Sequence, residues 1–239
     1  MIPFRTTVAA SRSPVVTMTL IVINIAIFFV QLGLSPSEEI RFLYSYALVP
    51  AVYGNPAQAR ALGLDPTNFL PLITNTFMHG GFLHIILNMW TLWLFGVPLE
   101  DRLGPWRFLL FYLASGAAGS LAHLVFNLGS TVPALGASGA VAGVLGGFTW
   151  LFPRAKVAVV IPIIVVPLIF HWPALVYTAL WFGLQVFQGT AALGAGPATG
   201  GIAWWAHIGG FLAGLAIAAW LRPKTVLRRR PWDRRPWEH

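Results

Sequence analysis

The sequence predicts an all-α membrane protein with six transmembrane helices. Its 239 residues are 57% hydrophobic and only 9% charged, whereas an ordinary soluble domain carries about 25% charged residues. Six apolar stretches contain no Asp, Glu, Lys or Arg, and we expect each to cross the roughly 30 Å of bilayer hydrocarbon. They are residues 15–34, 83–99, 108–128, 137–152, 172–188 and 202–221.

The distribution of Lys and Arg predicts that both termini are cytoplasmic. If residues 1–14 are cytoplasmic, six spans place thirteen of the fifteen basic residues in cytoplasmic segments, as the positive-inside bias favours. Seven of them lie in residues 222–239, directly after the last span. Such a basic tail at a membrane exit indicates topology, and we expect no nucleic-acid partner.

Between the fourth and fifth spans, residues 157–171 are apolar but short. Pro162 and Pro167 interrupt this stretch, and proline breaks a helix interior. We therefore expect a re-entrant or interfacial connection, not a seventh span.

The spans organise the chain into three parts. The first apolar stretch runs for 20 residues without a small-residue cleavage site, which favours a retained anchor over a cleaved signal. The outer segment that follows it is rich in proline, glycine and aromatic residues, and we expect it to rest in the outer interface. The predicted parts are a cytoplasmic segment (1–14), a membrane domain (15–221) and a basic cytoplasmic tail (222–239).

Polar residues in the spans point to a site in the outer leaflet. The chain has no Cys, which excludes thiolate chemistry, and charge-paired transport paths lack the acidic and basic groups that they need. His84 and Asn88 share one helix face because they are four residues apart, while Ser138 and His207 lie near the starts of the fourth and sixth spans. Even-numbered spans all run inward from the outer side, so we expect these four residues to converge.

Small residues favour close contact between the fourth and sixth spans. Alone, each polar residue could simply make a hydrogen bond between helices. Two rows with four-residue spacing, however, predict helix packing that brings Ser138 next to His207. The rows are Gly139, Gly143 and Gly147, and Gly210, Gly214 and Ala218.

This combination of residues fits acyl transfer. A serine hydroxyl needs a base, and neutral imidazole is the usual one. Because no carboxylate lies in the spans, a Ser138–His207 dyad is favoured over a triad. Ser138 also lies in the first turn of its helix, where backbone N–H groups lack intrahelical partners. With His84 and Asn88 as side-chain donors, this N–H could form an oxyanion hole.

Four stretches resemble, in order and spacing, the rhomboid intramembrane serine proteases. They are HGGFLHIILN (79–88), EDRLG (100–104), GASG (136–139) and AHIGGFLAG (206–214). The resemblance implies a six-transmembrane-helix rhomboid-like bundle and an endopeptidase that cleaves transmembrane segments near the outer leaflet through an acyl-enzyme. It implies these roles: nucleophile, Ser138; general base, His207; oxyanion hole, His84, Asn88 and the Ser138 backbone; active-site loop, Gly136.

The resemblance also implies partners and a route of access. Single-span membrane proteins in the lipid bilayer are the expected substrates, and no cofactor or metal is expected. Separately from the resemblance, the short loops and the absence of a targeting sequence favour a prokaryotic cytoplasmic membrane as the location. The fifth span is expected to form a lateral gate against the second, with Leu87 and Trp181 in contact across it. In the family an aromatic often follows the serine by one turn and supports the histidine; here Ala142 takes that place.

Three alternatives remain open from the sequence. The first is a catalytically inactive rhomboid-like protein that binds membrane segments; such relatives typically lose the serine or histidine, and this chain has both. The second is a zinc site of His79, His84 and His207, which lacks an HExxH helix. The third is a channel or transporter without proteolysis. Inhibition by a fluorophosphonate but not by a chelator would distinguish a serine protease from a metalloenzyme.

Overall fold

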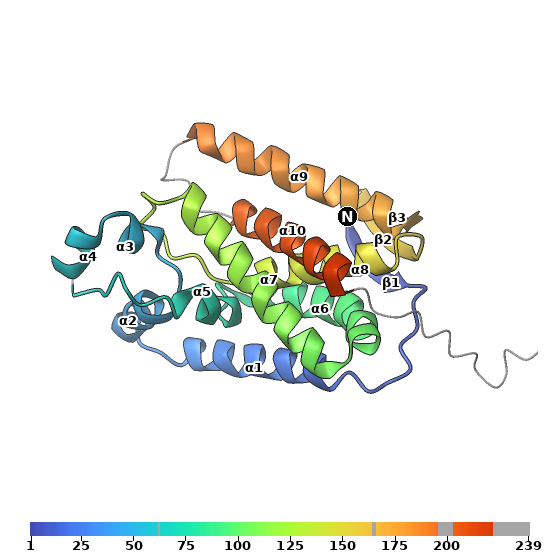
Figure 1. The fold of residues 1–239 in the computed structure, drawn as a ribbon, viewed down its shortest axis with the longest axis horizontal. Helices are drawn as coiled ribbons and strands as arrows, with labels where there is room; N and C mark the ends of the chain where they lie inside the picture. The colour runs from blue at the N-terminus through green and yellow to red at the C-terminus, as the bar shows by residue number, and fades with distance from the viewer. Residues whose placement is uncertain (62, 164–165, 196–202, 222–239) are drawn as a thin grey trace, which may run out of the picture.

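The long helices run roughly along one axis of the molecule (Figure 1). The computed structural model describes residues 1–61, 63–163, 166–195 and 203–221. Helix α8 is the core of the bundle: its residues 139–149 are all buried, and α6, α7, α9 and α10 pack around it. The helices are α1 (Val15–Leu32), α6 (Phe82–Leu103), α7 (Pro105–Phe126), α8 (Ser138–Leu151), α9 (Ala174–Ala195) and α10 (Trp204–Leu221).

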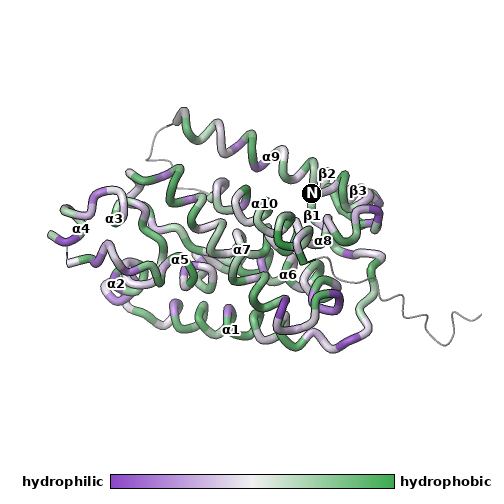
Figure 2. Tube along the Cα trace, viewed as in Figure 1, coloured by the Kyte–Doolittle hydropathy of each residue, from purple (hydrophilic) through white to green (hydrophobic). Residues whose placement is uncertain are grey.

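Each of the six predicted spans overlaps one of these helices. In the described part of the chain, α1, α6, α7 and α10 are long and apolar enough to cross a membrane, and α8 is apolar but only 14 residues long. Hydrophobic residues predominate along the long helices (Figure 2). The chain is therefore an integral membrane protein, while the count of six spans and the cytoplasmic termini stay predictions. The predicted basic tail lies outside the described residues.

The prediction of an all-α fold was wrong at one end of the bundle, where three strands form a sheet. Strands β1 (Ile2–Thr6), β2 (Lys156–Ile163) and β3 (Val166–Pro173) pair antiparallel in that order. Valine and isoleucine dominate residues 157–169, and β-branched residues favour extended backbone. The two prolines that argued against a helix lie opposite each other in the β2–β3 register. Residues 157–163 and 166–171 are thus strand, and they lie in the connection between α8 and α9.

Short helices at the other end form the outer segment (Figure 1). Four of them begin at a proline, which suits the first helical position because its missing N–H would have no intrahelical partner. They are α2 (Pro36–Tyr46), α3 (Pro50–Gly54), α4 (Pro56–Ala61) and α5 (Pro71–Thr74), followed by the 3₁₀ helix η1 (Asn75–Phe77). The expected contact of this segment with the membrane interface stays a prediction.

Segments assigned to one side of the membrane meet at one end of the molecule. Strand β1, from the predicted cytoplasmic segment, pairs with β2 from the 4–5 connection. The Asp101 carboxylate, at the α6–α7 turn, accepts hydrogen bonds from the Ser11 hydroxyl and the Arg12 N–H. At the opposite end, Leu48 pairs with Ala134 from the predicted outer loop 129–136. This grouping matches the alternation that six spans require.

Glu100 joins α1 to α6 through the backbone amides in the first turn of α1. Its carboxylate accepts hydrogen bonds from the Val16 N–H (2.9 Å), the Thr17 N–H (2.7 Å) and the Thr17 hydroxyl (2.7 Å). These amides lie in the first turn, where they have no intrahelical partner and the helix dipole is positive. Only 4% of the Glu100 side chain is exposed. Helix α6 extends past the predicted span to Leu103, and this acid lies in that extension.

Replacing Glu100 by alanine is expected to destabilise the protein. The buried Thr17 amide and hydroxyl would lose a charged acceptor, and such a hydrogen bond contributes about 1.5 to 3 kcal/mol. Thermal unfolding of the purified protein in detergent micelles measures the loss. Glu39→Ala is the control, because Glu39 is exposed on α2. Equal unfolding temperatures for the two variants would contradict a role for Glu100 in anchoring α1.

Candidate active site

Helices α8 and α10 touch through their backbones. A Cβ added to Gly210 would overlap the carbonyl group of Gly139, and one added to Gly214 would overlap the carbonyl group of Gly143. Only glycine permits such an approach, because any side chain would hold the helices apart. The packing predicted from the two small-residue rows is confirmed at these four positions.

The last glycine of the predicted row on α8, Gly147, does not face α10. A Cβ on Gly147 would meet the Phe111 ring and Leu99, whereas a Cβ on Gly146 would overlap the Phe211 carbonyl group of α10. A helix has 3.6 residues per turn, so a row with four-residue spacing drifts around its surface. Over two turns this drift replaces Gly147 by Gly146 at the α10 contact.

Ser138 is the first residue of α8. The first backbone N–H groups of a helix have no intrahelical acceptor. The helical hydrogen-bond pattern of α8 starts with the Val141 N–H, which donates to the Ala137 carbonyl at 2.9 Å. The amides before it, including that of Ser138, lie in the first turn, which has no intrahelical acceptor for them. The positive end of the helix dipole is therefore at the serine.

Gly136 brings His84 close to Ser138. Its φ of +132° is unfavourable for any residue with a side chain, and its N–H donates to the Asn75 carbonyl at 2.9 Å. A Cβ at this position would lie 2.8 Å from His84 Nε2 and 3.7 Å from Ser138 Oγ. The histidine ring from α6 and the serine hydroxyl from α8 therefore border the same glycine.

Asn88 presents a buried donor one helical turn after His84. Its side chain is 6% exposed, and its Nδ2 has no hydrogen-bond partner within the described residues. Native proteins satisfy most buried polar groups, so an unpaired amide requires an explanation.

The loop before α6 is fixed to α1, because the Gln31 amide bonds to both the N–H and the carbonyl of His79.

His207 lies in the first turn of α10 and is held mainly from α9. Its Nδ1 is 2.6 Å from Gln185 Oε1, and the rings of Trp181 and Trp204 lie at centroid distances of 6.0 and 6.1 Å. The preceding residue, Ala206, lines a small cavity of about 10 Å³ together with Gly136 and Ser138. The α8–α10 interface thus brings the start of α10 to the serine, while a Ser138–His207 hydrogen bond stays a prediction.

Sequence reasoning missed Gln185. Like the candidate histidines, asparagine and serine, Gln185 is a polar residue in a predicted apolar span, residues 172–188. It was overlooked because it has no nucleophilic or basic role of its own. Its position in α9 shows that support for His207 comes from outside α8, where Ala142 is small and buried.

The predicted gate residues lie on α6 and α9. Leu87 is 44% exposed, and the ring of Trp181 neighbours Phe211 of α10 at 5.9 Å. The stacked rings of Phe95 and Tyr177, at 6.2 Å, bring α6 and α9 together. A direct contact between Leu87 and Trp181 stays a prediction.

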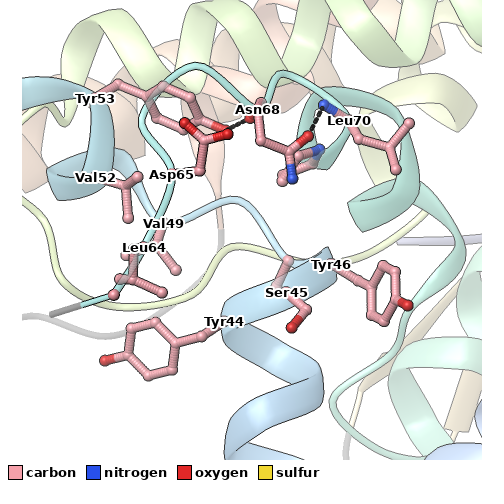
Figure 3. Close-up of a pocket in the computed structure, with 13 residues that line it drawn as sticks. Tyr44, Ser45, Tyr46, Val49, Val52, Tyr53, Leu64, Asp65, Asn68 and Leu70 are labelled. Carbon is pink, nitrogen blue, oxygen red and sulfur yellow. Dashed lines mark hydrogen bonds between the residues drawn. The ribbon is translucent and has the colours of Figure 1, made fainter. Parts of the chain in front are cut away.

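A larger cavity, of about 310 Å³, lies in the outer segment (Figure 3). The Tyr53 hydroxyl donates to the Asn68 carbonyl beside it, and the Leu70 N–H donates to the Asn68 side chain. None of the candidate catalytic residues lines this cavity. Across the described residues, no three His, Cys, Asp or Glu side chains are arranged to hold a metal ion.

Comparison with known proteins identifies a family. The Rhomboid domain matches residues 66–224. Similar proteins include "Rhomboid protein 1, mitochondrial" of Saccharomyces cerevisiae, 33% identical over 87% of this chain and 53% of its own length. Another is "Rhomboid protease GluP" of Bacillus subtilis, 42% identical over 34% of this chain and 15% of its own length.

The chain spans about half or less of the length of these relatives. Their whole-protein activities are therefore not carried over as findings. Because both mitochondrial and bacterial proteins are among them, the expected prokaryotic cytoplasmic membrane stays a prediction.

Gly210→Ala is expected to separate α8 from α10 and to lower stability. The added methyl group would overlap the Gly139 carbonyl group, and overpacking of this kind costs about 1 to 3 kcal/mol. Thermal unfolding in detergent measures the loss. Gly183→Ala is the control, since a Cβ there would meet no atom within 4 Å, and alanine in an open helix position is expected to be neutral or stabilising. If Gly183→Ala lowered the unfolding temperature as much as Gly210→Ala, the specific contact of Gly210 with Gly139 would be refuted.

Proposed function

The chain belongs to the rhomboid family, and on this basis we propose that it is an intramembrane serine endopeptidase. Its Ser138–His207 dyad cleaves transmembrane segments of membrane proteins near the outer leaflet. The observation that carries the proposal is the meeting of three helices. His84 of α6 and Ser138 of α8 border Gly136, and Ala206 of α10, the residue before His207, lines a small cavity with Gly136 and Ser138.

In the proposed reaction, His207 accepts the proton of Ser138 as Oγ attacks the scissile carbonyl carbon. The protonated imidazole then donates this proton to the leaving amine, and an acyl-enzyme remains on Ser138. Water attacks the ester in the second half, again with His207 as the base. The enzyme is restored when the serine regains its proton.

The oxyanion is stabilised by three donors in this proposal. They are the Ser138 N–H at the positive end of α8, the His84 ring and the Asn88 amide. The unpaired, buried Nδ2 of Asn88 supports this assignment, because a donor that is free in the resting protein is available when charge develops. The three groups come from two helices whose separation is fixed by Gly136.

Substrates enter from the bilayer in this proposal, through a lateral gate between α9 and α6. Helix α9 is joined to α8 by the β2–β3 connection and packs mainly against α10 and α8. Trp181 and Leu87 are the proposed contact across the gate. Single-span membrane proteins are the proposed substrates, and both termini of the six-span chain are proposed to be cytoplasmic.

Ser138→Ala and His207→Ala are each expected to abolish cleavage, and the double variant should be no worse than either one. The residues act as a unit, so their losses do not add. Purified protein in liposomes is incubated with a panel of single-span substrates, and the cuts are mapped by mass spectrometry. Cleavage by Ser138→Ala at the wild-type rate would refute the nucleophile.

Fluorophosphonate labelling separates this proposal from its alternatives. Wild-type protein should be labelled at Ser138 and inhibited, whereas a chelator should have no effect. Substrate binding by wild-type protein without labelling or cleavage would instead identify an inactive protein that binds membrane segments.

His84→Ala and Asn88→Ala are expected to slow cleavage without abolishing it. Removing one preorganised donor costs about 10² to 10³ in rate, and the Ser138 N–H remains. Initial rates with one substrate measure the effect. Thr91→Val is the control on the same helix, because the Thr91 hydroxyl bonds to the Leu87 carbonyl of its own helix. Wild-type rates in both alanine variants would show that this face of α6 only packs.

A further inference from the structure

The hydrogen bond between Gln185 and His207 joins two helices at the proposed base. Gln185 projects from α9 and is 6% exposed, and its Oε1 lies 2.6 Å from Nδ1 of His207 in α10. This separation is at the short end for hydrogen bonds of this type. The contact is therefore close and partly buried.

The surroundings of Gln185 fix which end of its amide faces the histidine. Its Nε2 donates to the Trp181 carbonyl oxygen at 3.4 Å, and a carbonyl oxygen can only accept. The oxygen of the amide must therefore face His207. Because that oxygen is also only an acceptor, Nδ1 of His207 must carry the hydrogen.

Two aromatic rings complete the support of the imidazole. Trp181 is inclined by 31° to the His207 ring, and Trp204 meets it at 87°. Trp181 comes from the same face of α9 as Gln185, one turn earlier. The rings restrict the orientation of the imidazole, and the glutamine selects its protonated nitrogen.

We propose that Gln185 is a positioning residue that holds His207 in the tautomer with hydrogen on Nδ1. This inference rests on the proposed function for its catalytic meaning. In that tautomer Nε2 keeps its lone pair and can take the proton of Ser138. Once His207 is protonated, the Nδ1–H to Gln185 hydrogen bond becomes charge-assisted and therefore stronger, so the glutamine also favours the intermediate state of the reaction.

Three variants separate this role from simple packing. Gln185→Leu keeps a side chain of similar size and removes the acceptor, while Gln185→Glu restores an acceptor at the same distance. Gln188→Leu is the matched control, because Gln188 lies on the same helix but is exposed. All three are compared with wild-type protein in liposomes.

The kinetic expectation is a loss in kcat with KM unchanged. In metal sites, groups that orient a histidine by a hydrogen bond contribute about 10- to 100-fold in activity, and we expect a loss of the same order in Gln185→Leu. Gln185→Glu should recover much of this loss, and Gln188→Leu should match the wild type. Equal losses of kcat in Gln185→Leu and Gln185→Glu would overturn the proposal. The same holds if Gln188→Leu loses as much kcat as Gln185→Leu, or if Gln185→Leu keeps the wild-type kcat.

The tautomer itself provides a readout that does not need cleavage. Protein labelled with ¹⁵N-histidine should show His207, assigned by its loss in His207→Ala, with a protonated Nδ1 in wild type and in Gln188→Leu. Gln185→Leu should show a mixture of the two tautomers, and an unchanged Nδ1 signal would refute the assignment. A wild-type protein with this signal but without protease activity would contradict the proposed function alone.

Discussion

The backbone contact between α8 and α10 is the constraint on which the site depends. It places Gly139 and Gly143 against Gly210 and Gly214 with no side chain between them. Without water or a hydrophobic driving force in a bilayer, association of this kind relies on close packing. A methyl group at Gly210 or Gly214 would overlap the α8 backbone and push apart the two helices that carry Ser138 and His207. Stability and catalytic geometry are therefore set by the same few glycines.

Connections at the two ends of the bundle hold the remaining parts of the site. At one end, Glu100 fixes the start of α1 to α6, and at the opposite end Gln31, near the end of α1, fixes the loop before α6. Also at that end, the Asn75 carbonyl holds Gly136 beside His84. Each of these bonds joins segments far apart in the sequence. The α6 side of the candidate site thus depends on polar contacts, whereas the α8–α10 side depends on shape.

Hydropathy and small-residue spacing predicted the six long helices and the glycine contact because both depend on local composition. The sheet was missed because strands β1 and β2 are about 150 residues apart, and their pairing leaves no local pattern beyond β-branched residues. Glu100 and Gln185 were missed for a related reason: each acts through a partner on another helix. The approach of His84 to Ser138 was expected from topology, but only the left-handed Gly136 explains how close it becomes.

Helix α9 carries two proposed roles that make opposite demands on it. As a gate it must move away from α6, and as the carrier of Gln185 it must stay against α10. N–H···O hydrogen bonds in proteins span about 2.7 to 3.2 Å, so a shift of α9 by about 1 Å would take the 2.6 Å contact out of this range and release Nδ1 of His207. If both roles hold, an open gate leaves the base without its orienting partner. A substrate helix is then cut only after α9 has returned to α10, which links closure of the bundle around the substrate to activation of the serine.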